Sequence, residues 1–402
     1  MARSPVTRCF FLAAALAAFS ACASAQPDRP PAPVPAPVSV PPPPAPVVTH
    51  PPPTRPDPPR PAPPQLWPTT SLHGLDYIDV RDIAARFGLK PAWSKSDLAM
   101  TLGDRSGVRC TFEARQHDFY CEGLRVFLGE PVLREKDSLW VSKLDVIKIV
   151  APLLRPVDRL AVLPAAAPHV IVIDPGHGGS DPGKENRLVG INEKTMTLDT
   201  ALRLRKLLEA QGWRVILTRT EDRELSPNKK TDLQLRDDLA NRSKADLFLS
   251  IHFNSVEKEA ERVTGLETYA MTPQFMFSAG GEKRDDMTDV AYPGNKLDFA
   301  NLMLAAHLHR SMLTTLKTPD RGLKHARWGV LRMLNCPGVL IECAYLSNVT
   351  EARRVATPEY REKIAEALDA GLQNYAAALA ALRPPPLPPP APAPSPAVAP
   401  AK

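Results

Sequence analysis

The sequence has little of what marks an integral membrane protein or a nucleic-acid-binding protein. Its formal net charge is only +6 over 402 residues, which is too small for the basic footprint that a nucleic-acid partner needs. The apolar run CFFLAAALAAFS near the N-terminus is shorter than the roughly 20 residues of a permanent membrane span. We therefore expect no nucleic acid among the partners of this protein.

The same apolar run has the features of an export signal. Arg3 and Arg8 precede it, and the small-residue stretch ACASAQ follows it, as at a signal-peptidase site. We expect residues 1–25 to be a signal peptide and the protein to be exported to the cell envelope, either to the periplasm or outside the cell. Cleavage after Ala25 would release it, whereas lipidation of Cys22 would make it a lipoprotein.

Cysteine is also scarce, and the chain has six. Cys110 and Cys121 flank the stretch TFEARQHDFY. A symmetric hairpin centred on Arg115 and Gln116 would place the two side chains directly opposite each other. In an oxidising compartment that pair can form a cross-strand disulfide.

Proline, by contrast, is abundant and unevenly spread. The chain holds 46 prolines, most of them crowded into residues 26–71 and 383–402. Such sequences favour polyproline II and cannot build ladders of backbone hydrogen bonds. We expect residues 26–71 to be a stiff linker behind the leader, and residues 383–402 to be a Pro/Ala-rich disordered tail.

Residues 72–157 have the pattern of a small α+β domain. YIDVRDIAARFG and LWVSKLDVIKIVAPL each predict a short strand followed by a helix, with Asp79 or Ser142 as the N-cap. The alternating stretches between them, LAMTLG, VRCTFEA and FYCEGLRVFL, predict hairpin strands. This segment resembles the small stalk-type domains at the N-terminus of copper amine oxidases and on many bacterial cell-wall proteins. The resemblance implies a wall-binding or stalk role.

A linker over residues 158–168 is expected to lead into a segment, 169–382, in which strands and helices alternate. HVIVID is a continuous apolar run of the buried parallel type, and DLFLSIHFNS, GLETYAM and PGVLIECAYLSN predict further strands. We expect an α/β fold with an open, mostly parallel sheet and helices on both faces. Residues 274–294 lack a clear period and predict a long loop over the site.

Capping signals mark two of the helices. Thr231 and Gln234 form a capping box that predicts the start of the helix TDLQLRDDLANRSK. Thr357 followed by Pro358 predicts the start of the last helix, with proline at its first position.

Candidate chemistry lies where the predicted strands end. His177 follows VIVID, Glu193 begins the next helix, His252 ends LFLSI and Glu342 ends GVLI. Ligands of open α/β sheets gather at the carboxyl ends of strands. Each residue alone has a structural explanation, such as a turn or a helix-dipole contact, but four of them at one crevice favour a functional site.

The residue types at this crevice suggest a metal hydrolase. Two imidazoles and one carboxylate with an open fourth position are the ligands of a catalytic zinc, which His177, Glu193 and His252 can supply. A separate carboxylate, Glu342, would then act as the general base. The glycines of IDPGHGGSDPG would let the backbone pass close to metal and substrate, because a Cβ atom would obstruct it.

The motifs VIDPGHGGSDPG, NEK, LFLSIHFNS, DRGLKHARWGVLR and PGVLIECAYLSN resemble, in order and spacing, the zinc-dependent N-acetylmuramoyl-L-alanine amidases of bacterial cell-wall turnover. The resemblance implies that His177, Glu193 and His252 hold zinc and that Glu342 is the catalytic base. It also implies the substrate, which is the amide joining N-acetylmuramic acid to the first L-alanine of the peptidoglycan stem peptide.

Further residues are candidates for substrate contacts. Asn254 lies two positions beyond His252, Glu267 lies in the strand GLETY, and Arg332 precedes the strand that carries Glu342. An arginine at that place can meet a stem-peptide carboxylate.

Two other functions use the same residues. A zinc peptidase that cuts within the stem peptide needs the same ligands and base, and an inactive wall-binding protein would keep them without turnover. The expected cofactor is Zn²⁺ and the expected partner is peptidoglycan. We expect a monomer, and the family allows for a protein activator.

Overall fold

The predicted alternation of strands and helices is present in the computed structural model of the protein, which describes residues 67–94, 96–158, 167–279 and 286–382. One group of strands lies parallel and side by side in the order β13 (Arg214–Leu217), β10 (Val170–Pro175), β14 (Leu247–Asn254) and β17 (Gly338–Tyr345). The predicted open α/β fold is therefore confirmed.

Several predictions fall outside these ranges. The described residues do not include the signal peptide with Cys22, the first 41 positions of the linker 26–71, the proline-rich tail and most of the linker 158–168. Among the helices of the described ranges, none combines the length and the apolar character that a membrane crossing requires.

The sheet continues past β17 with a change of direction. β15 (Leu266–Met271) pairs antiparallel with β17, and β16 (Asp320–Ala326) pairs parallel with β15. The sequence pattern does not predict β16, because DRGLKHA is polar, contains a glycine and lacks a continuous apolar run. Since β15 runs against β14 and β17, the chain after it leaves the sheet at the opposite edge from their carboxyl ends. Of the residues 274–294 that were predicted to lie over the site, 274–279 and 286–294 therefore do not lie there, and 280–285 are outside the described residues.

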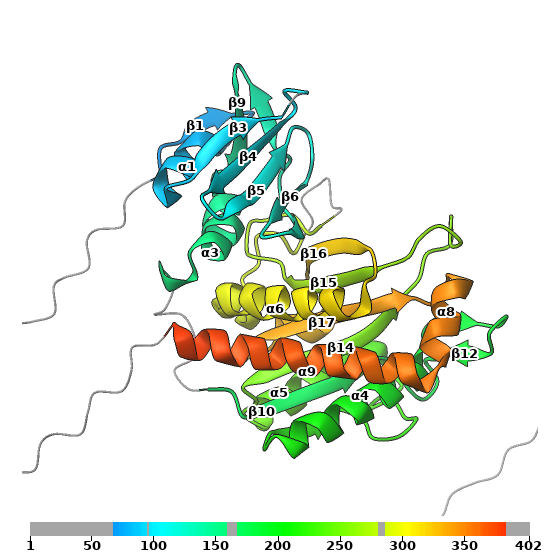
Figure 1. The fold of residues 1–402 in the computed structure, drawn as a ribbon. Helices are drawn as coiled ribbons and strands as arrows, with labels where there is room; N and C mark the ends of the chain where they lie inside the picture. The colour runs from blue at the N-terminus through cyan, green and yellow to red at the C-terminus, as the bar shows by residue number, and fades with distance from the viewer. Residues whose placement is uncertain (1–66, 95, 159–166, 280–285, 383–402) are drawn as a thin grey trace, which may run out of the picture. The chain divides into compact units, whose positions relative to one another are not determined.

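Helices cover both faces of the sheet. The long helices α4 (Glu193–Ala210), α6 (Asp298–Leu316) and α9 (Pro358–Ala381) pack on one face, where α6 and α9 lie side by side (Figure 1). The other face carries α5 (Lys229–Arg242) and the short α7 (Gly329–Arg332) over a second apolar cluster. The remaining elements of this segment are β11 (Glu185–Asn186), β12 (Ile191–Asn192), the 3₁₀ helix η3 (Pro293–Leu297) and α8 (Val349–Ala356).

The structure confirms one capping prediction and corrects the other. The side chain of Thr357 caps α9, and Pro358 is its first residue. Helix α5, however, begins earlier than predicted, because the side chain of Asn228 accepts the backbone N–H of Thr231 at its N-terminus. Asparagine caps helices as well as threonine does, so the capping box at Thr231 was a false signal.

The segment before residue 158 is built from short strands and helices. They are β1 (Thr70–Leu72), β2 (Leu75–Asp79), α1 (Val80–Phe87), β3 (Lys90–Trp93), β4 (Ala99–Asp104), β5 (Gly107–Glu113), β6 (Asp118–Cys121), β7 (Leu124–Phe127), β8 (Leu133–Glu135), β9 (Ser138–Ser142), α2 (Lys143–Asp145), the π-helix η1 (Val146–Val150) and α3 (Ala151–Leu154). Asp79 and Ser142 cap α1 and α2 with their side chains, as predicted.

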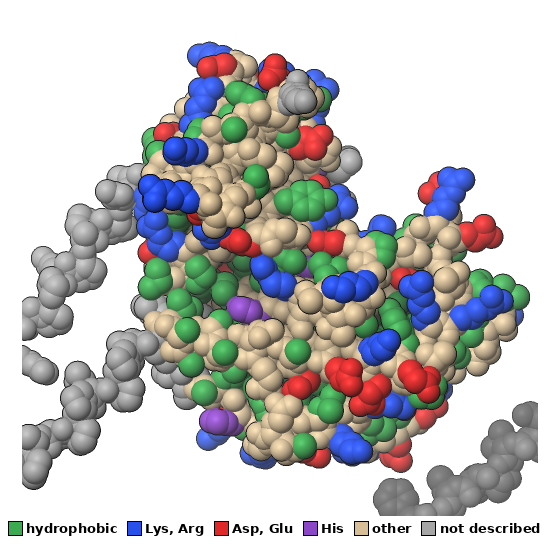
Figure 2. Space-filling model, viewed as in Figure 1, with side chains coloured by type: hydrophobic (Ala, Val, Ile, Leu, Met, Phe, Trp, Pro, Cys, Tyr) green, Lys and Arg blue, Asp and Glu red, His purple; other side chains and the backbone are tan. Residues whose placement is uncertain are grey.

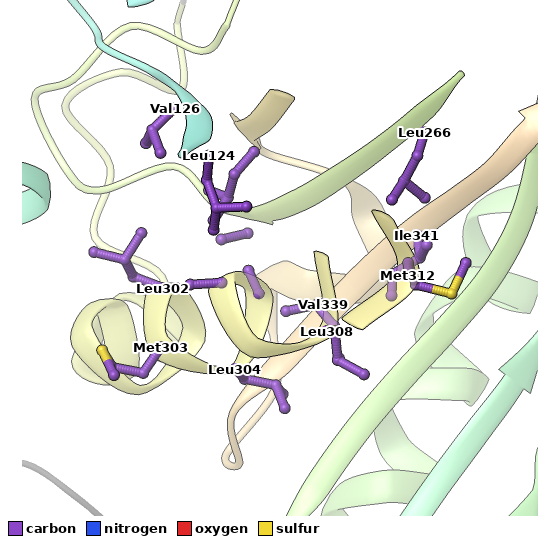
Figure 3. Close-up of a cluster of buried hydrophobic side chains, with 14 of the residues drawn as sticks. Leu124, Val126, Leu266, Leu302, Met303, Leu304, Leu308, Met312, Val339 and Ile341 are labelled. Atoms are coloured by element: carbon purple, nitrogen blue, oxygen red, sulfur yellow. The ribbon is translucent and has the colours of Figure 1, made fainter. Parts of the chain in front are cut away.

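This segment shares a sheet and a core with the α/β part. Leu323 of β16 pairs with Val126 of β7, so the sheet runs on through β7, β6, β5, β4 and β3. Leu124 and Val126 pack toward Leu302 of α6, in the same cluster that holds Val339 and Ile341 of β17 (Figure 3). The proposed boundary near residues 158–168 stays a prediction, and the strand pairing crosses from one segment to the other.

We predict that Cys110 and Cys121 form a disulfide in an oxidising compartment. They are directly opposite in the hairpin of β5 and β6, both buried, with their Sγ atoms 3.4 Å apart as thiols. Closing so short a loop stabilises a fold by roughly 3 kcal/mol. Mass spectrometry of oxidised protein should find the two cysteines linked, and thermal unfolding should show a lower Tm after reduction. Full alkylation of both thiols without reductant would contradict the prediction.

Candidate metal centre

Three of the predicted residues meet at the carboxyl ends of the parallel strands. His177 lies in the loop after β10, Glu193 is the first residue of α4, and His252 lies near the end of β14. Each offers one ligand atom, and these atoms all lie within 4.8 Å of one another. Oε1 of Glu193 lies between the rings, 3.0 Å from Nε2 of His177 and 3.0 Å from Nδ1 of His252.

The Glu193 carboxylate is fixed by the backbone around it. Its Oε1 accepts the N–H of Phe253 at 3.0 Å, and its Oε2 accepts the N–H of Lys184 at 2.9 Å. Burial alone would raise its pKa, but the hydrogen bonds to His177 and His252 outweigh burial and hold the pKa of Glu193 well below its usual range. The residue is therefore an ionised carboxylate held between two imidazoles.

Two buried arginines hold the loop that presents His177. Arg219 donates to the carbonyls of Pro175 at 3.0 Å and Gly176 at 2.9 Å. Arg236 donates to the carbonyl of His177 at 3.0 Å. These bonds hold the backbone of His177 in a strained conformation. Its φ is 64°, in the left-handed region that residues other than glycine rarely adopt. Neither arginine can be identified from the sequence pattern, because the partners of both are backbone atoms of a distant loop.

The glycines of this loop lie against the candidate ligands. A Cβ atom on Gly176 would lie 2.2 Å from the His252 ring, and one on Gly183 would lie 2.6 Å from Oε2 of Glu193. Only glycine fits such a close approach. At these two positions the structure agrees with the interpretation that the glycines keep Cβ atoms away from the site.

Asp181 is a partner of His177 that the sequence analysis did not single out. Its Oδ2 lies 3.0 Å from Nδ1 of His177, and the Lys229 ammonium binds the same carboxylate. Burial lowers the pKa of His177, but the carboxylates of Glu193 and Asp181 outweigh it and raise that pKa overall. With Asp181 on Nδ1, the ring presents Nε2 to the cluster, which is the usual arrangement behind a metal-bound histidine.

Glu342 of β17 is paired with residues of the site on both neighbouring strands. In the strand pairing it is opposite His252 of β14 on one side and opposite Glu267 of β15 on the other. Its Oε2 is buried and has no hydrogen-bond partner among the described residues. Burial, together with the nearby charges of Glu193 and Glu267, raises the pKa of Glu342 well above its usual value.

Two of the predicted substrate contacts, Glu267 and Asn254, already have partners, and Glu267 is opposite Glu342 in the strand pairing. Asn254 donates from Nδ2 to Oε2 of Glu267 at 2.9 Å. Glu267 is only 2% exposed. It also accepts from Lys324 at 2.7 Å and from the hydroxyl of Tyr345 at 2.6 Å. Burial opposes its ionisation, yet Lys324 and these hydrogen bonds lower the pKa of Glu267.

Arg332 lies elsewhere. Its guanidinium contacts Sδ of Met287 at 3.3 Å and lies over the ring of Tyr292, 5.5 Å from the centroid. It belongs to α7, which precedes the amino end of β17, whereas the metal-type cluster lies toward the carboxyl ends. Proximity to β17 along the chain thus does not bring Arg332 to the cluster.

Comparisons with known proteins show what this chain is similar to. Residues 171–374 match the family model described as N-acetylmuramoyl-L-alanine amidase. An uncharacterized cell wall amidase of Bacillus anthracis is 32% identical over 206 residues, which cover 51% of this chain and 35% of that protein. The germination-specific N-acetylmuramoyl-L-alanine amidase of Bacillus subtilis strain 168 is 31% identical over 218 residues, covering 51% of this chain and 79% of that protein. A solved N-acetylmuramoyl-L-alanine amidase from Clostridium difficile 630 is 30% identical, with a TM-score of 0.41 and coverage of 52% of this chain and 97% of that one.

Proposed function

The chain belongs to the N-acetylmuramoyl-L-alanine amidase family, and we propose that it hydrolyses the amide between N-acetylmuramic acid and the L-alanine of the peptidoglycan stem peptide, with zinc as its cofactor. The observation that carries the proposal is the cluster of His177, Glu193 and His252 with Glu342 beside it in the strand pairing. The matched region covers about a third of the length of the Bacillus anthracis relative and most of the length of the Bacillus subtilis relative. The activity of this chain is therefore a proposal.

The residues present fit a zinc ion. Two imidazole nitrogens and one carboxylate oxygen form the ligand set of catalytic zinc sites, which leave one position open. The backbone N–H groups that hold the Glu193 carboxylate and the contact of Asp181 with Nδ1 of His177 orient two of these ligands. The orphaned Oε2 of Glu342 gives the site a proton acceptor that is not already engaged by the described residues. When bound, zinc acts as a Lewis acid on the amide carbonyl and makes water in the open position more acidic.

Glu342 would carry the proton during hydrolysis. Its carboxylate takes a proton from the attacking water at Oε2, while the water oxygen bonds to the carbonyl carbon and the electron pair of the C=O π bond moves to the carbonyl oxygen. It then gives that proton to the alanine nitrogen as the C–N bond breaks. The products are the carboxylic acid on the sugar and a peptide with a free amino terminus. Burial raises the pKa of Glu342, which helps the group to hold the proton between the two steps, whereas a cation held by the neighbouring ligands would lower that pKa and favour the carboxylate that takes the proton.

Product analysis tests the proposal. The mature chain is incubated with defined muropeptides, with and without a chelator, and the products are identified by mass spectrometry. The proposal expects intact stem peptides with a free N-terminal alanine, formed only while zinc is available. Shortened stem peptides still attached to sugar would instead identify a peptidase. Bound zinc without any product would favour a wall-binding protein.

The substrate requires export, because peptidoglycan lies outside the cytoplasmic membrane. The predicted signal peptide over residues 1–25 would supply that export. The mass of the mature N-terminus distinguishes cleavage after Ala25 from lipidation of Cys22. Size-exclusion chromatography tests the expected monomer, and addition of envelope extract to the assay tests for a protein activator by a gain in rate.

A further inference from the structure

One face of the sheet continues from the candidate metal centre onto the segment before residue 158. Side chains alternate between the two faces along a strand. On β7, Val126 points into the core beneath α6, so Arg125 and Phe127 point to the opposite face. On β17, Ile341 points into that same core, so Glu342 also points to the opposite face. Arg125, Phe127 and Glu342 therefore share one face of the sheet.

A continuous set of contacts joins these residues across the strands. Lys324 of β16 donates to Glu267 at 2.7 Å. Its ammonium lies 5.8 Å from the ring centroid of Tyr269 and 5.1 Å from that of Phe127. The guanidinium carbon of Arg125 lies 5.0 Å from the same Phe127 centroid. We call Tyr269, Lys324, Phe127 and Arg125 the basic–aromatic strip.

Gly322 of β16 allows the strip to lie flat on the sheet. A Cβ atom at this position would lie 2.6 Å from Cε2 of Phe127, and the φ of Gly322 is +102°. The Phe127 ring therefore covers a place where β16 has no side chain of its own. The strip begins beside Glu267, the partner of Glu342 in the strand pairing, and ends at Arg125.

Arg125 is a cation held in a fixed orientation. Asp118 accepts from its Nε at 2.6 Å and from its Nη2 at 3.3 Å. The Arg125 side chain is 34% exposed, whereas that of Asp118 is only 10% exposed. A guanidinium has five N–H donors in a planar fork that matches carboxylates, and Asp118 receives two of them. The remaining donors are on the end that faces away from Asp118.

We propose that the basic–aromatic strip binds the stem peptide on the leaving side of the cut and that Arg125 binds its C-terminal carboxylate. This inference rests on the proposed function. A peptide joined to the sugar through its amino group must end in a carboxylate. Strands lie about 4.8 Å apart, so β7 is about 14 Å from β17. An extended peptide of about four residues spans that distance.

On the face covered by α6 and α9, acidic side chains gather over α9 (Figure 2), which would repel such a ligand.

The test compares two muramoyl tetrapeptides that differ only at the C-terminus, one with a carboxylate and one with a carboxamide. The unmodified chain should cleave the carboxylate form with a kcat/KM about tenfold higher, as expected for one charge-assisted contact. Arg125→Ala should lower kcat/KM for the carboxylate form about tenfold and remove the preference. A muramoyl dipeptide, which is too short to reach β7, should be cleaved equally by both proteins. The preference is the ratio of the two kcat/KM values measured on the same protein preparation. Partial unfolding lowers both values by the same factor and leaves the ratio unchanged.

Arg109→Ala is the matched control. Arg109 is on β5, on the same face, with a side chain 29% exposed and paired with Asp104 and Glu122, but it lies two strands farther from the site. This variant should keep the preference of the unmodified chain. Equal cleavage of both tetrapeptides by the unmodified chain, or a preference that persists in Arg125→Ala, would overturn the inference while leaving the proposed function intact. Failure to release peptide from any substrate would overturn the proposed function and the inference with it.

Discussion

Glu342→Gln is expected to keep its metal ion and to lose amide hydrolysis by a factor of roughly 10²–10⁴, the usual contribution of a general acid–base group. Glutamine has the size of glutamate but cannot take a proton from water at neutral pH. The proposed ligands His177, Glu193 and His252 stay in place, so metal binding should persist. Release of stem peptide measured by mass spectrometry, together with zinc content per chain, checks both halves of the prediction.

The control for this variant makes the same chemical change far from the site. Glu359 is an exposed residue in the first turn of α9, and Glu359→Gln should cleave muropeptides at the rate of the unmodified chain. Thermal unfolding should give similar Tm values for both variants. A Glu342→Gln protein that turns over at nearly the unmodified rate would remove Glu342 from the role of base.

The parts of the fold that could be predicted are those that leave a local pattern. Buried parallel strands such as β10 are continuous apolar runs, because both of their faces are covered by helices. The carboxyl ends of such strands meet at one edge of the sheet. That rule predicts one group for His177, Glu193 and His252 from the sequence, and the structure brings their ligand atoms within 4.8 Å of one another.

Strand direction was the main feature that the local pattern did not reveal. GLETYAM predicts a strand equally well in either direction, yet its antiparallel pairing with β17 decides at which edge the next loop lies. Arg332 precedes β17 along the chain and so lies at the amino end of that strand, away from the cluster at the carboxyl ends. Knowledge of element type alone cannot resolve such questions, because pairing depends on contacts between distant segments.

The supports of the site were also beyond prediction. Arg236 of α5 bonds the backbone carbonyl of His177, and β7 joins β16 by the pairing of Val126 with Leu323. Each of these contacts joins segments that are far apart in the sequence, and neither changes the local periodicity. An arginine on a helix has the same sequence pattern whether it faces water or holds a catalytic loop.

His177→Ala is expected to lose both metal and activity, unlike Glu342→Gln. Without the imidazole of His177, the cluster keeps only His252 and Glu193 as ligands. Two ligands bind zinc more weakly than three. We expect zinc affinity to fall by more than roughly 100-fold, since even loss of a supporting contact behind a ligand costs 10–100-fold. Competition with a colorimetric chelator measures the affinity, and muropeptide cleavage at saturating zinc measures the remaining activity.

His307→Ala separates loss of the ligand from loss of a histidine in general. His307 is a partly buried residue of α6, and its ring centroid lies 6.1 Å from that of Tyr375. The cluster takes its ligands from the loop after β10, from α4 and from β14, and not from α6. Its removal costs packing but no ligand, so zinc affinity and turnover should both be retained. If instead His177→Ala bound zinc as tightly as His307→Ala and still released stem peptide, the metal would have to be held by other residues. The cluster would then be a hydrogen-bonded support of the loop after β10, with Glu193 fixing two imidazoles in place.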